Sequence, residues 1–216
     1  MANRLALPPL YVILDAVLLP SDPVDFLKRL MKAGARLFQY RNKTAPAREV
    51  LQAVQALTVT ARQEKALFLA NDRPDIARLA WANGVHVGQD DLEVAAARAI
   101  VGPDAIVGIS THNLEQLKAA AATDADYIAV GPVFETKSKV QPDPVVGLEL
   151  IREARRLTRK PLVAIGGITL ERAEEVFRAG ADSVAVISDI LAAKNPPARV
   201  KQYLDIVPGA AQPAKN

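Results

Sequence analysis

The sequence predicts an α/β protein that folds as a single (β/α)8 TIM barrel, and two observations support that prediction. Eight apolar runs of three to five residues alternate strictly with eight segments whose apolar residues keep helical spacing. Such alternation is typical of parallel strands joined by crossover helices. Eight units within 216 residues favour closure of the sheet into a barrel over an open sheet.

A weak internal repeat supports the barrel. The junctions between a predicted helix and the next strand resemble one another at Ala33-Gly34-Ala35, Ala82-Asn83-Gly84, Asp124-Ala125-Asp126 and Ala179-Gly180-Ala181-Asp182. They recur at a spacing of roughly two strand–helix units, as expected of a barrel built from quarter repeats. We therefore assign residues 1–216 to one domain and expect flexible tails at 1–9 and 209–216.

The first half of the chain holds four strand–helix units. An apolar run that is too short for a helix predicts each buried strand. The first helix begins at Pro23, because Asp22 can accept hydrogen bonds from its first turn, and it ends at Gly34. The strands are Leu10–Leu14, Leu37–Tyr40, Leu67–Ala70 and Val85–Val87, and the next helices are Pro46–Glu64, Pro74–Ala82 and Leu92–Val101.

The second half holds the other four units. Asn113 is expected to cap a helix that runs through Ala122, and Thr169 is expected to cap one that stops at Gly180. The strands are Ile106–Ile109, Tyr127–Val130, Leu162–Ile165 and Val184–Ile187. The remaining helices are Gly147–Leu157 and Ile190–Ile206, the latter broken near Pro196-Pro197.

The composition excludes several classes of protein. The formal net charge is +3, and the basic residues are spread along the chain, so nothing resembles a nucleic-acid-binding patch. No apolar run is long enough to span a membrane. The chain has no cysteine, which excludes disulfides and thiolate catalysis. We expect a cytoplasmic protein without nucleic-acid or membrane partners, and assembly into a homo-oligomer stays open.

Charged side chains collect after the predicted strands, where the catalytic groups of this fold lie. Arg41 and Lys43 are cationic there, and Asp72 and Asp91 follow neighbouring strands. Two carboxylates without cysteine suit a hard cation, with Mg²⁺ favoured. Cations beside such a pair suit a phosphorylated or pyrophosphorylated substrate. Two alternatives stay open, because Asp72 and Asp90 could each cap the helix that follows them.

A glycine turn and a long loop are candidates for binding a phosphate. Gly166-Gly167 follow an apolar strand, and glycines leave backbone N–H groups open to bind an anion. In this fold the loops after the seventh and eighth strands often bind a phosphate. The candidates are Gly167, Ile187 and Ser188, and the alternative is that the glycines only allow close packing of helix on strand. Residues 131–146 form a loop longer than a barrel connection needs. Its candidates are Thr136, Ser138, Lys137 and Lys139, and the alternative is a solvated charged loop.

Gln39, Arg41 and Lys43 stand two residues apart, so their side chains share one face of the second strand. An inward stripe of such polar groups is costly unless it meets a ligand. His86 lies within the fourth strand, and we expect it to be a packed, hydrogen-bonded histidine rather than a ligand-binding residue. The second strand is therefore predicted to line the binding site, and His86 is predicted to be packed within the fourth strand.

From Leu10 to about Leu191 the chain resembles the thiamine-phosphate synthase family. Six short motifs in order support the resemblance: Gln39–Lys43, Asn71–Arg73, Gly84–Asp91, Gly108–His112, Gly131–Phe134 and Ile165–Ile168. The resemblance implies the (β/α)8 barrel reached above and an enzyme that joins 4-amino-2-methyl-5-hydroxymethylpyrimidine diphosphate to a thiazole phosphate, plain or carboxylated. It also implies release of pyrophosphate by Mg²⁺-assisted dissociative substitution.

The resemblance implies roles for the residues at matching positions. The pyrimidine diphosphate would bind to Gln39, Arg41, Lys43, Asn71, Ser110 and Lys139, and the thiazole phosphate to Thr136, Ser138, Gly167, Ile187 and Ser188. Asp72 and Asp91 would hold Mg²⁺, and Lys139, Ser110 and Arg41 would be the catalytic residues. Glu135 stands where the family often has proline, which puts the geometry of that loop in question.

Three other functions stay open. A thiazole tautomerase-like barrel would lack the pair of carboxylates and would carry histidine where Pro132 stands. A sugar-phosphate epimerase barrel needs metal-binding histidines or paired acid and base carboxylates, and this chain has 2 histidines. A non-catalytic thiamine-phosphate-binding protein would not need all of these charged residues. Asp91 and Pro132 together favour the synthase.

Overall fold

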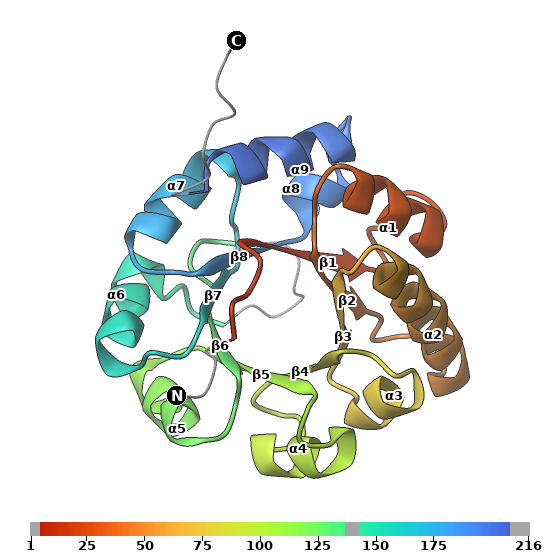
Figure 1. The fold of residues 1–216 in the computed structure, drawn as a ribbon. Coiled ribbons are helices and arrows are strands. Elements are labelled where there is room, and N and C mark those ends of the chain that lie inside the picture. Colours follow the sequence, from red (N-terminus) through yellow and green to blue (C-terminus); the bar gives the residue numbers. More distant parts are fainter. Residues whose placement is uncertain (1–4, 137–142, 208–216) are drawn as a thin grey trace.

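The computed structural model describes residues 5–136 and 143–207, which form a closed barrel of parallel strands inside a ring of helices (Figure 1). Each strand pairs with its neighbours in the sequence, and β1 closes the ring against β8. The strands are β1 (Leu10–Asp15), β2 (Leu37–Arg41), β3 (Leu67–Asn71), β4 (Gly84–Val87), β5 (Ile106–Thr111), β6 (Tyr127–Val130), β7 (Leu162–Ile165) and β8 (Ser183–Val186). The predicted (β/α)8 fold is confirmed.

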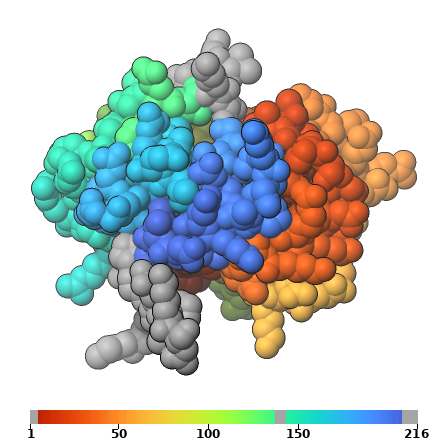
Figure 2. Space-filling model, turned by 90° about the horizontal axis from the view of Figure 1, so that it is seen from above, coloured from red at the N-terminus to blue at the C-terminus, as the bar shows by residue number. Residues whose placement is uncertain are grey.

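Helices cover the outside of the barrel (Figure 1). They are α1 (Pro23–Lys32), α2 (Ala47–Gln63), α3 (Pro74–Leu79), α4 (Val94–Val101), α5 (Leu114–Ala122), α6 (Gly147–Leu157), α7 (Leu170–Arg178), α8 (Ser188–Leu191) and α9 (Pro196–Asp205). The last two replace the single broken helix predicted over residues 190–206. Helix α9 contacts α1, α7 and α8, so the first and last helices lie side by side on the outer wall (Figure 2). Among the described helices, none has both the length and the apolar character that a membrane crossing requires.

Two of the three predicted capping residues make side-chain hydrogen bonds to the first turn of their helix, and the third does not. The Asp22 carboxylate accepts hydrogen bonds from the first turn of α1, and Asn113 does the same for α5. Thr169 precedes α7, but its side chain makes no capping hydrogen bond. Its hydroxyl instead bonds the Glu171 carboxylate, and this hydrogen bond lowers the pKa of Glu171. Thr169 therefore occupies the predicted cap position of α7, but the prediction that its side chain caps the helix is wrong.

The alternative that Asp72 and Asp90 cap helices is also wrong. The residue at the cap position of α3 is Arg73, and that of α4 is Glu93. Neither of those side chains makes a capping hydrogen bond. Both aspartates instead line a cavity at the carboxyl ends of the strands. The helix starts thus leave these carboxylates free for other partners.

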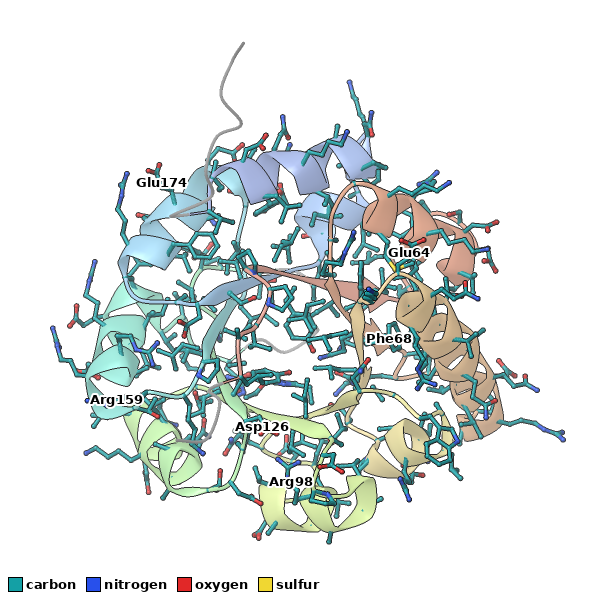
Figure 3. The ribbon with its side chains drawn as sticks, viewed as in Figure 1. Glu64, Phe68, Arg98, Asp126, Arg159 and Glu174 are labelled. Atoms are coloured by element: carbon teal, nitrogen blue, oxygen red, sulfur yellow. The ribbon has the colours of Figure 1, made fainter. Side chains whose placement is uncertain are left out.

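The alternation of side chains along the strands divides the apolar residues into two layers. Inward-facing side chains such as Tyr11, Leu37, Leu69 and Val163 fill the barrel. Outward-facing side chains pack against the helices, and Phe68 of β3, labelled in Figure 3, is fully buried in that layer. Toward the carboxyl ends of the strands the inward positions carry polar side chains instead. The packed interior therefore ends in a polar mouth, where barrel enzymes place their active sites.

Three of the four repeated helix–strand junctions share one hydrogen-bonding arrangement at the opposite end of the barrel. Asp126, just before β6, accepts a hydrogen bond of 2.7 Å from the Val107 N–H of β5. The same oxygen pairs with Arg98 of α4 at 2.5 Å, and both side chains are labelled in Figure 3. The arrangement recurs at Asp182 with Leu162 and Arg155, and with a neutral acceptor at Asn83 with Phe68. The weak sequence repeat thus has a physical basis at three of its four junctions, where a side chain supplies an acceptor to the preceding strand. The junction at Ala33-Gly34-Ala35 is followed by Arg36, which donates to carbonyl groups instead.

Replacing Asp126 by alanine should destabilise the fold. The Asp126→Ala variant removes the acceptor of the Val107 N–H and the partner of Arg98, so we expect the free energy of unfolding to fall by about 3 kcal/mol. Asp126→Asn keeps an acceptor and loses only the charge, for which about 1 kcal/mol is expected. Urea unfolding followed by circular dichroism measures both, with Asp104→Ala at an exposed carboxylate as control. Equal losses of unfolding free energy for Asp126→Ala and Asp104→Ala would contradict this account.

Candidate active site

A cavity of about 780 Å³ opens at the carboxyl ends of the strands, and residues of all eight strands line it. The structure brings every described residue of the predicted site into this one cavity. They are Gln39, Arg41, Lys43, Asn71, Asp72, Asp91, Ser110, Thr136, Gly167, Ile187 and Ser188. The predicted residues Ser138 and Lys139, with Lys137, lie outside the described residues. Shared location does not by itself assign a role, so the roles stay predictions.

The cationic side of the cavity is built on β2. Arg41 ends β2 and stands in register with Asp15 at the end of β1, and its guanidinium donates to the Asp15 carboxylate. The Asp15 side chain is only 5% exposed, so Arg41 neutralises a buried charge. A guanidinium carries five N–H donors, more than this carboxylate requires, and Arg41 also lines the cavity. Sequence analysis missed Asp15, because only the register of β1 against β2 brings it to Arg41.

Two carboxylates lie beside these cations at the mouth of the barrel. The Nζ of Lys43 lies 3.0 Å from Oδ2 of Asp72, and Oδ2 of Asp91 accepts a 2.7 Å hydrogen bond from the Gly88 N–H. Burial raises the pKa of the Asp91 carboxyl, and the nearby charge of Asp72, within hydrogen-bonding reach, raises it further. Two like charges this close favour a proton or a cation beside them. The pair of oxygen donors therefore suits a hard divalent cation that completes its shell with water or phosphate.

The backbone of Asp72 is held in an uncommon conformation. Its φ is 61°, in the left-handed region that residues other than glycine seldom adopt. Its N–H donates a 2.8 Å hydrogen bond to the carbonyl of His86 on the neighbouring strand β4. Strain of this kind costs on the order of 1 kcal/mol and gathers at functional sites. The conformation places the Asp72 carboxylate in the cavity, beside Lys43 and Asp91.

The glycine turn after β7 forms the opposite side of the cavity. Gly166 and Gly167 both have positive φ, 98° and 62°. A side chain on Gly166 would meet Pro132 at 2.5 Å, and one on Gly167 would meet the Glu135 carbonyl at 2.3 Å. The glycines are thus needed for close packing, but against the segment after β6 rather than between a helix and a strand. Their backbone also borders the cavity together with Ser188, as the phosphate-site prediction requires.

Arg172 is a further cation at this side of the cavity, and sequence analysis missed it. It lies on α7, where its Nη1 donates a 2.9 Å hydrogen bond to the Gly167 carbonyl. Its guanidinium stacks over the ring of Phe134, 4.7 Å from the ring centre. In the sequence Arg172 is one of several charged residues on an amphipathic helix, so no local signal separates it from the solvent-exposed ones.

Five polar side chains cross the barrel interior at the floor of the cavity, and four of them, all but Tyr127, line it. Gln39 Nε2 donates to the Tyr11 hydroxyl at 2.6 Å, and that hydroxyl lies 3.2 Å from the Tyr127 hydroxyl. His86 joins Tyr127 through Nδ1 and Ser110 through Nε2, each at 2.8 Å. Burial raises the pKa of both tyrosines and lowers that of His86 to about 4, so all three are neutral at pH 7. The prediction of a packed, hydrogen-bonded His86 is confirmed, whereas the two tyrosines went unnoticed in the sequence.

Comparison with known proteins agrees with this geometry. A family model described as thiamine monophosphate synthase matches residues 10–190. The chain belongs to the thiamine-phosphate synthase family. The thiamine-phosphate synthase of Koribacter versatilis is 50% identical over 212 residues, which are 96% of this chain and 99% of that protein. The synthase of Anaeromyxobacter dehalogenans is 45% identical over 196 residues, covering 91% of this chain and 86% of the relative.

A solved structure supports the same assignment. The thiamine phosphate pyrophosphorylase of Pyrococcus furiosus superposes with a TM-score of 0.84 at 36% sequence identity, covering 91% of this chain and 94% of that one. The expected resemblance from Leu10 to about Leu191 is therefore confirmed. The chain is an enzyme of the thiamine-phosphate synthase family, a group of transferases in thiamine biosynthesis.

The buried His86 of this synthase should make its stability depend on pH. The folded state protonates His86 only near a pKa of about 4, whereas an unfolded histidine takes up a proton near 6.5. Between those values the unfolded state binds more protons, so the free energy of unfolding falls as the pH drops, by about 3 kcal/mol in all. Urea unfolding at pH 7, 5.5 and 4.5 should show a shallower fall for His86→Gln than for wild type. Identical slopes for wild type and His86→Gln would contradict the prediction.

Proposed function

We propose that this synthase joins 4-amino-2-methyl-5-hydroxymethylpyrimidine diphosphate to 4-methyl-5-(2-phosphoethyl)thiazole, or its carboxylated form, to give thiamine phosphate and pyrophosphate. The observation that carries the proposal is one cavity with cations and paired carboxylates at one side and a bare glycine turn at the other. Such a site suits two phosphorylated substrates bound at once. The membership of the family and the names of the relatives support the same reaction.

The reaction needs little covalent participation from the protein. The thiazole nitrogen attacks the methylene carbon of the pyrimidine, and the carbon–oxygen bond to the diphosphate breaks with its electron pair leaving on the diphosphate. The electron-rich aminopyrimidine favours a dissociative path through a carbocation-like transition state. Arg41 and Lys43 stabilise the charge that grows on the leaving group, and the barrel orients the two rings and excludes water. No side chain has to act as a nucleophile.

Asp72 and Asp91 are the residues that would hold Mg²⁺. Their carboxylates lie within hydrogen-bonding reach of each other, and the raised pKa of Asp91 reflects both its burial and the charge of Asp72. Among the residues that the structure describes, no group of three His, Asp or Glu side chains is placed to hold a metal, so water and substrate phosphate would complete the shell. The ion supplies positive charge that stabilises the departing diphosphate.

The remaining predicted substrate contacts divide between the two sides of the cavity, one side for each substrate. Gln39, Asn71 and Ser110 would contact the pyrimidine diphosphate, and the residues near the glycine turn would hold the thiazole phosphate. These last residues are Thr136, Gly167, Ile187 and Ser188, with Arg172 as an additional cation nearby. Ser138 and Lys139 keep their predicted roles outside the described residues. We also keep the expectation of a cytoplasmic enzyme without nucleic-acid or membrane partners, with its oligomeric state open.

A pyrophosphate-release assay tests this function. Release should require both substrates and Mg²⁺, and Asp91→Asn should lower kcat/KM by at least about 100-fold, because a ligand of the ion is lost. Asp104→Asn, at the opposite end of the barrel, is the matched control and should match wild type. A change in the thiazole without pyrophosphate release would favour a tautomerase. Binding of thiamine phosphate without turnover would favour a non-catalytic binding protein.

A further inference from the structure

The five polar side chains at the floor of the cavity form one unbroken chain of hydrogen bonds, which we name the interior relay (Gln39, Tyr11, Tyr127, His86 and Ser110). Its links measure 2.6, 3.2, 2.8 and 2.8 Å in that order. It begins at a buried amide on β2, crosses the barrel to β6, and returns through β4 to Ser110 on β5. Both of its ends, Gln39 and Ser110, line the cavity at the predicted diphosphate site, so the relay links two predicted substrate contacts through the barrel interior.

Counting protons along the relay gives it a direction. Gln39 Nε2 donates to the Tyr11 hydroxyl. Either oxygen can donate in the 3.2 Å contact between Tyr11 and Tyr127, and we take Tyr11 as the donor because each hydroxyl then accepts one hydrogen bond and donates one. The Tyr127 proton then goes to Nδ1 of His86, its remaining partner. A neutral imidazole that accepts at Nδ1 carries its proton on Nε2, and that N–H donates to Ser110 Oγ. Ser110 keeps its own hydroxyl proton for a partner outside the relay.

We propose that the interior relay holds His86 in the Nε2–H tautomer and so turns the Ser110 hydroxyl proton toward the cavity, where it donates to a diphosphate oxygen of the substrate. Ser110 is then the residue that touches the substrate, and His86 and Tyr127 are positioning residues. The identity of the ligand rests on the proposed function, but the tautomer of His86 does not. The class of ligand is an anion, because the relay ends in a donor.

The surroundings of His86 hold it in place for this role. Its ring stacks on that of Tyr127 with centroids 5.5 Å apart and an interplanar angle of 21°, and Tyr127 meets Tyr11 edge-on at 6.2 Å. His86 is 8% exposed and both tyrosines are almost completely buried. Buried polar groups of this kind retain their partners, since a lost hydrogen bond inside the barrel is not replaced by water. We therefore expect these side chains to keep their hydrogen-bond partners whether or not a ligand is bound.

If every hydrogen bond of the relay ran in the other direction, Ser110 would present an acceptor to the cavity instead of a donor. If Tyr11 donated to the Gln39 amide oxygen, Tyr127 would donate to Tyr11. Nδ1 of His86 would then carry the imidazole proton and donate it to Tyr127. Ser110 would then donate to His86 and present only lone pairs to the cavity. Lone pairs repel the anion that Arg41 and Lys43 attract, so that direction opposes the charges of the cavity. One measurement of the His86 tautomer distinguishes the two directions.

Nitrogen-15 NMR of the ligand-free protein tests the proposal. The chain has 2 histidines, so a long-range ¹H–¹⁵N spectrum is simple, and His112→Asn assigns the two signals. We expect His86 to show a protonated Nε2 and an unprotonated Nδ1 at pH 7, whereas a protonated Nδ1 would overturn the proposal. Tyr127→Phe should change the His86 signals, and Tyr203→Phe, a matched loss of a buried hydroxyl on α9, should not.

Steady-state kinetics give a second readout. Tyr127→Phe should lower kcat about tenfold with little change in KM, as expected for one lost positioning hydrogen bond. Ser110→Ala should lower kcat by about 100-fold, because it removes the donor itself. Adding Tyr127→Phe to Ser110→Ala should cause no further loss, and an additive loss would overturn the proposal. An inactive wild type with the expected tautomer would reject the proposed function and leave the relay intact, so the two failures are distinguishable.

Discussion

Arg41→Gln should lower kcat about 1,000-fold, the largest effect expected of any single substitution in the cavity. Glutamine keeps the polar end of the side chain and removes the positive charge where the diphosphate leaves. The charge on a leaving diphosphate grows in the transition state, so the loss should fall on kcat more than on KM. Pyrophosphate release under saturating substrates measures it. Unchanged kcat with a raised KM would mean that Arg41 only binds the ground state.

The same substitution also affects the fold. Arg41 is the partner of Asp15, whose side chain is 5% exposed, and leaving a buried carboxylate unpaired costs about 3–5 kcal/mol. The double variant Asp15→Asn/Arg41→Gln removes both charges and should regain most of that stability without regaining activity. Recovery of kcat in the double variant would show that Arg41 acts only through the fold. Arg73→Gln, at an exposed ion pair with Asp75, is the control and should match wild type.

The fold was predictable because the periodicity of a parallel barrel is local. Each strand is an apolar run, each helix keeps its own spacing, and eight such units close the ring by themselves. Even the weak repeat at the junctions had a structural cause, since Asp126 and Asp182 bond the N–H groups of the preceding strands. The predicted Thr169 cap was wrong because a hydroxyl caps a helix only in a rotamer that aims its oxygen at the N–H groups of the first turn, and the local sequence does not set that rotamer.

The site was partly predictable for a different reason. The carboxyl ends of parallel strands meet at one mouth, so polar residues that follow different strands share a cavity without any knowledge of distances. What the sequence could not show are partnerships set by strand register or by the barrel interior. Asp15 meets Arg41 across β1 and β2, and Tyr11 meets Tyr127 across the barrel. In the sequence those residues look like the end of a strand and two ordinary core aromatics.

Gly84→Ala should destabilise the protein more than any other single methyl group added in the barrel. Gly84 begins β4 and stands in register with Ile106 of β5. A Cβ there would lie 1.9 Å from the Ile106 carbonyl oxygen and 2.6 Å from its carbonyl carbon. These are backbone atoms of a paired strand, so no side chain can rotate to make room. We expect the free energy of unfolding to fall by about 3–5 kcal/mol.

Gly102→Ala is the matched control for this prediction. Gly102 has φ 95° and nothing within 4 Å of an added Cβ, so alanine there meets only backbone strain, about 1 kcal/mol. Urea unfolding of the two variants therefore separates steric overlap from conformational strain. A loss at Gly84 no larger than that at Gly102 would mean that β4 and β5 can separate without cost. In that case the register that places Asn71, His86 and Ser110 beside one another would be less rigid than the barrel requires.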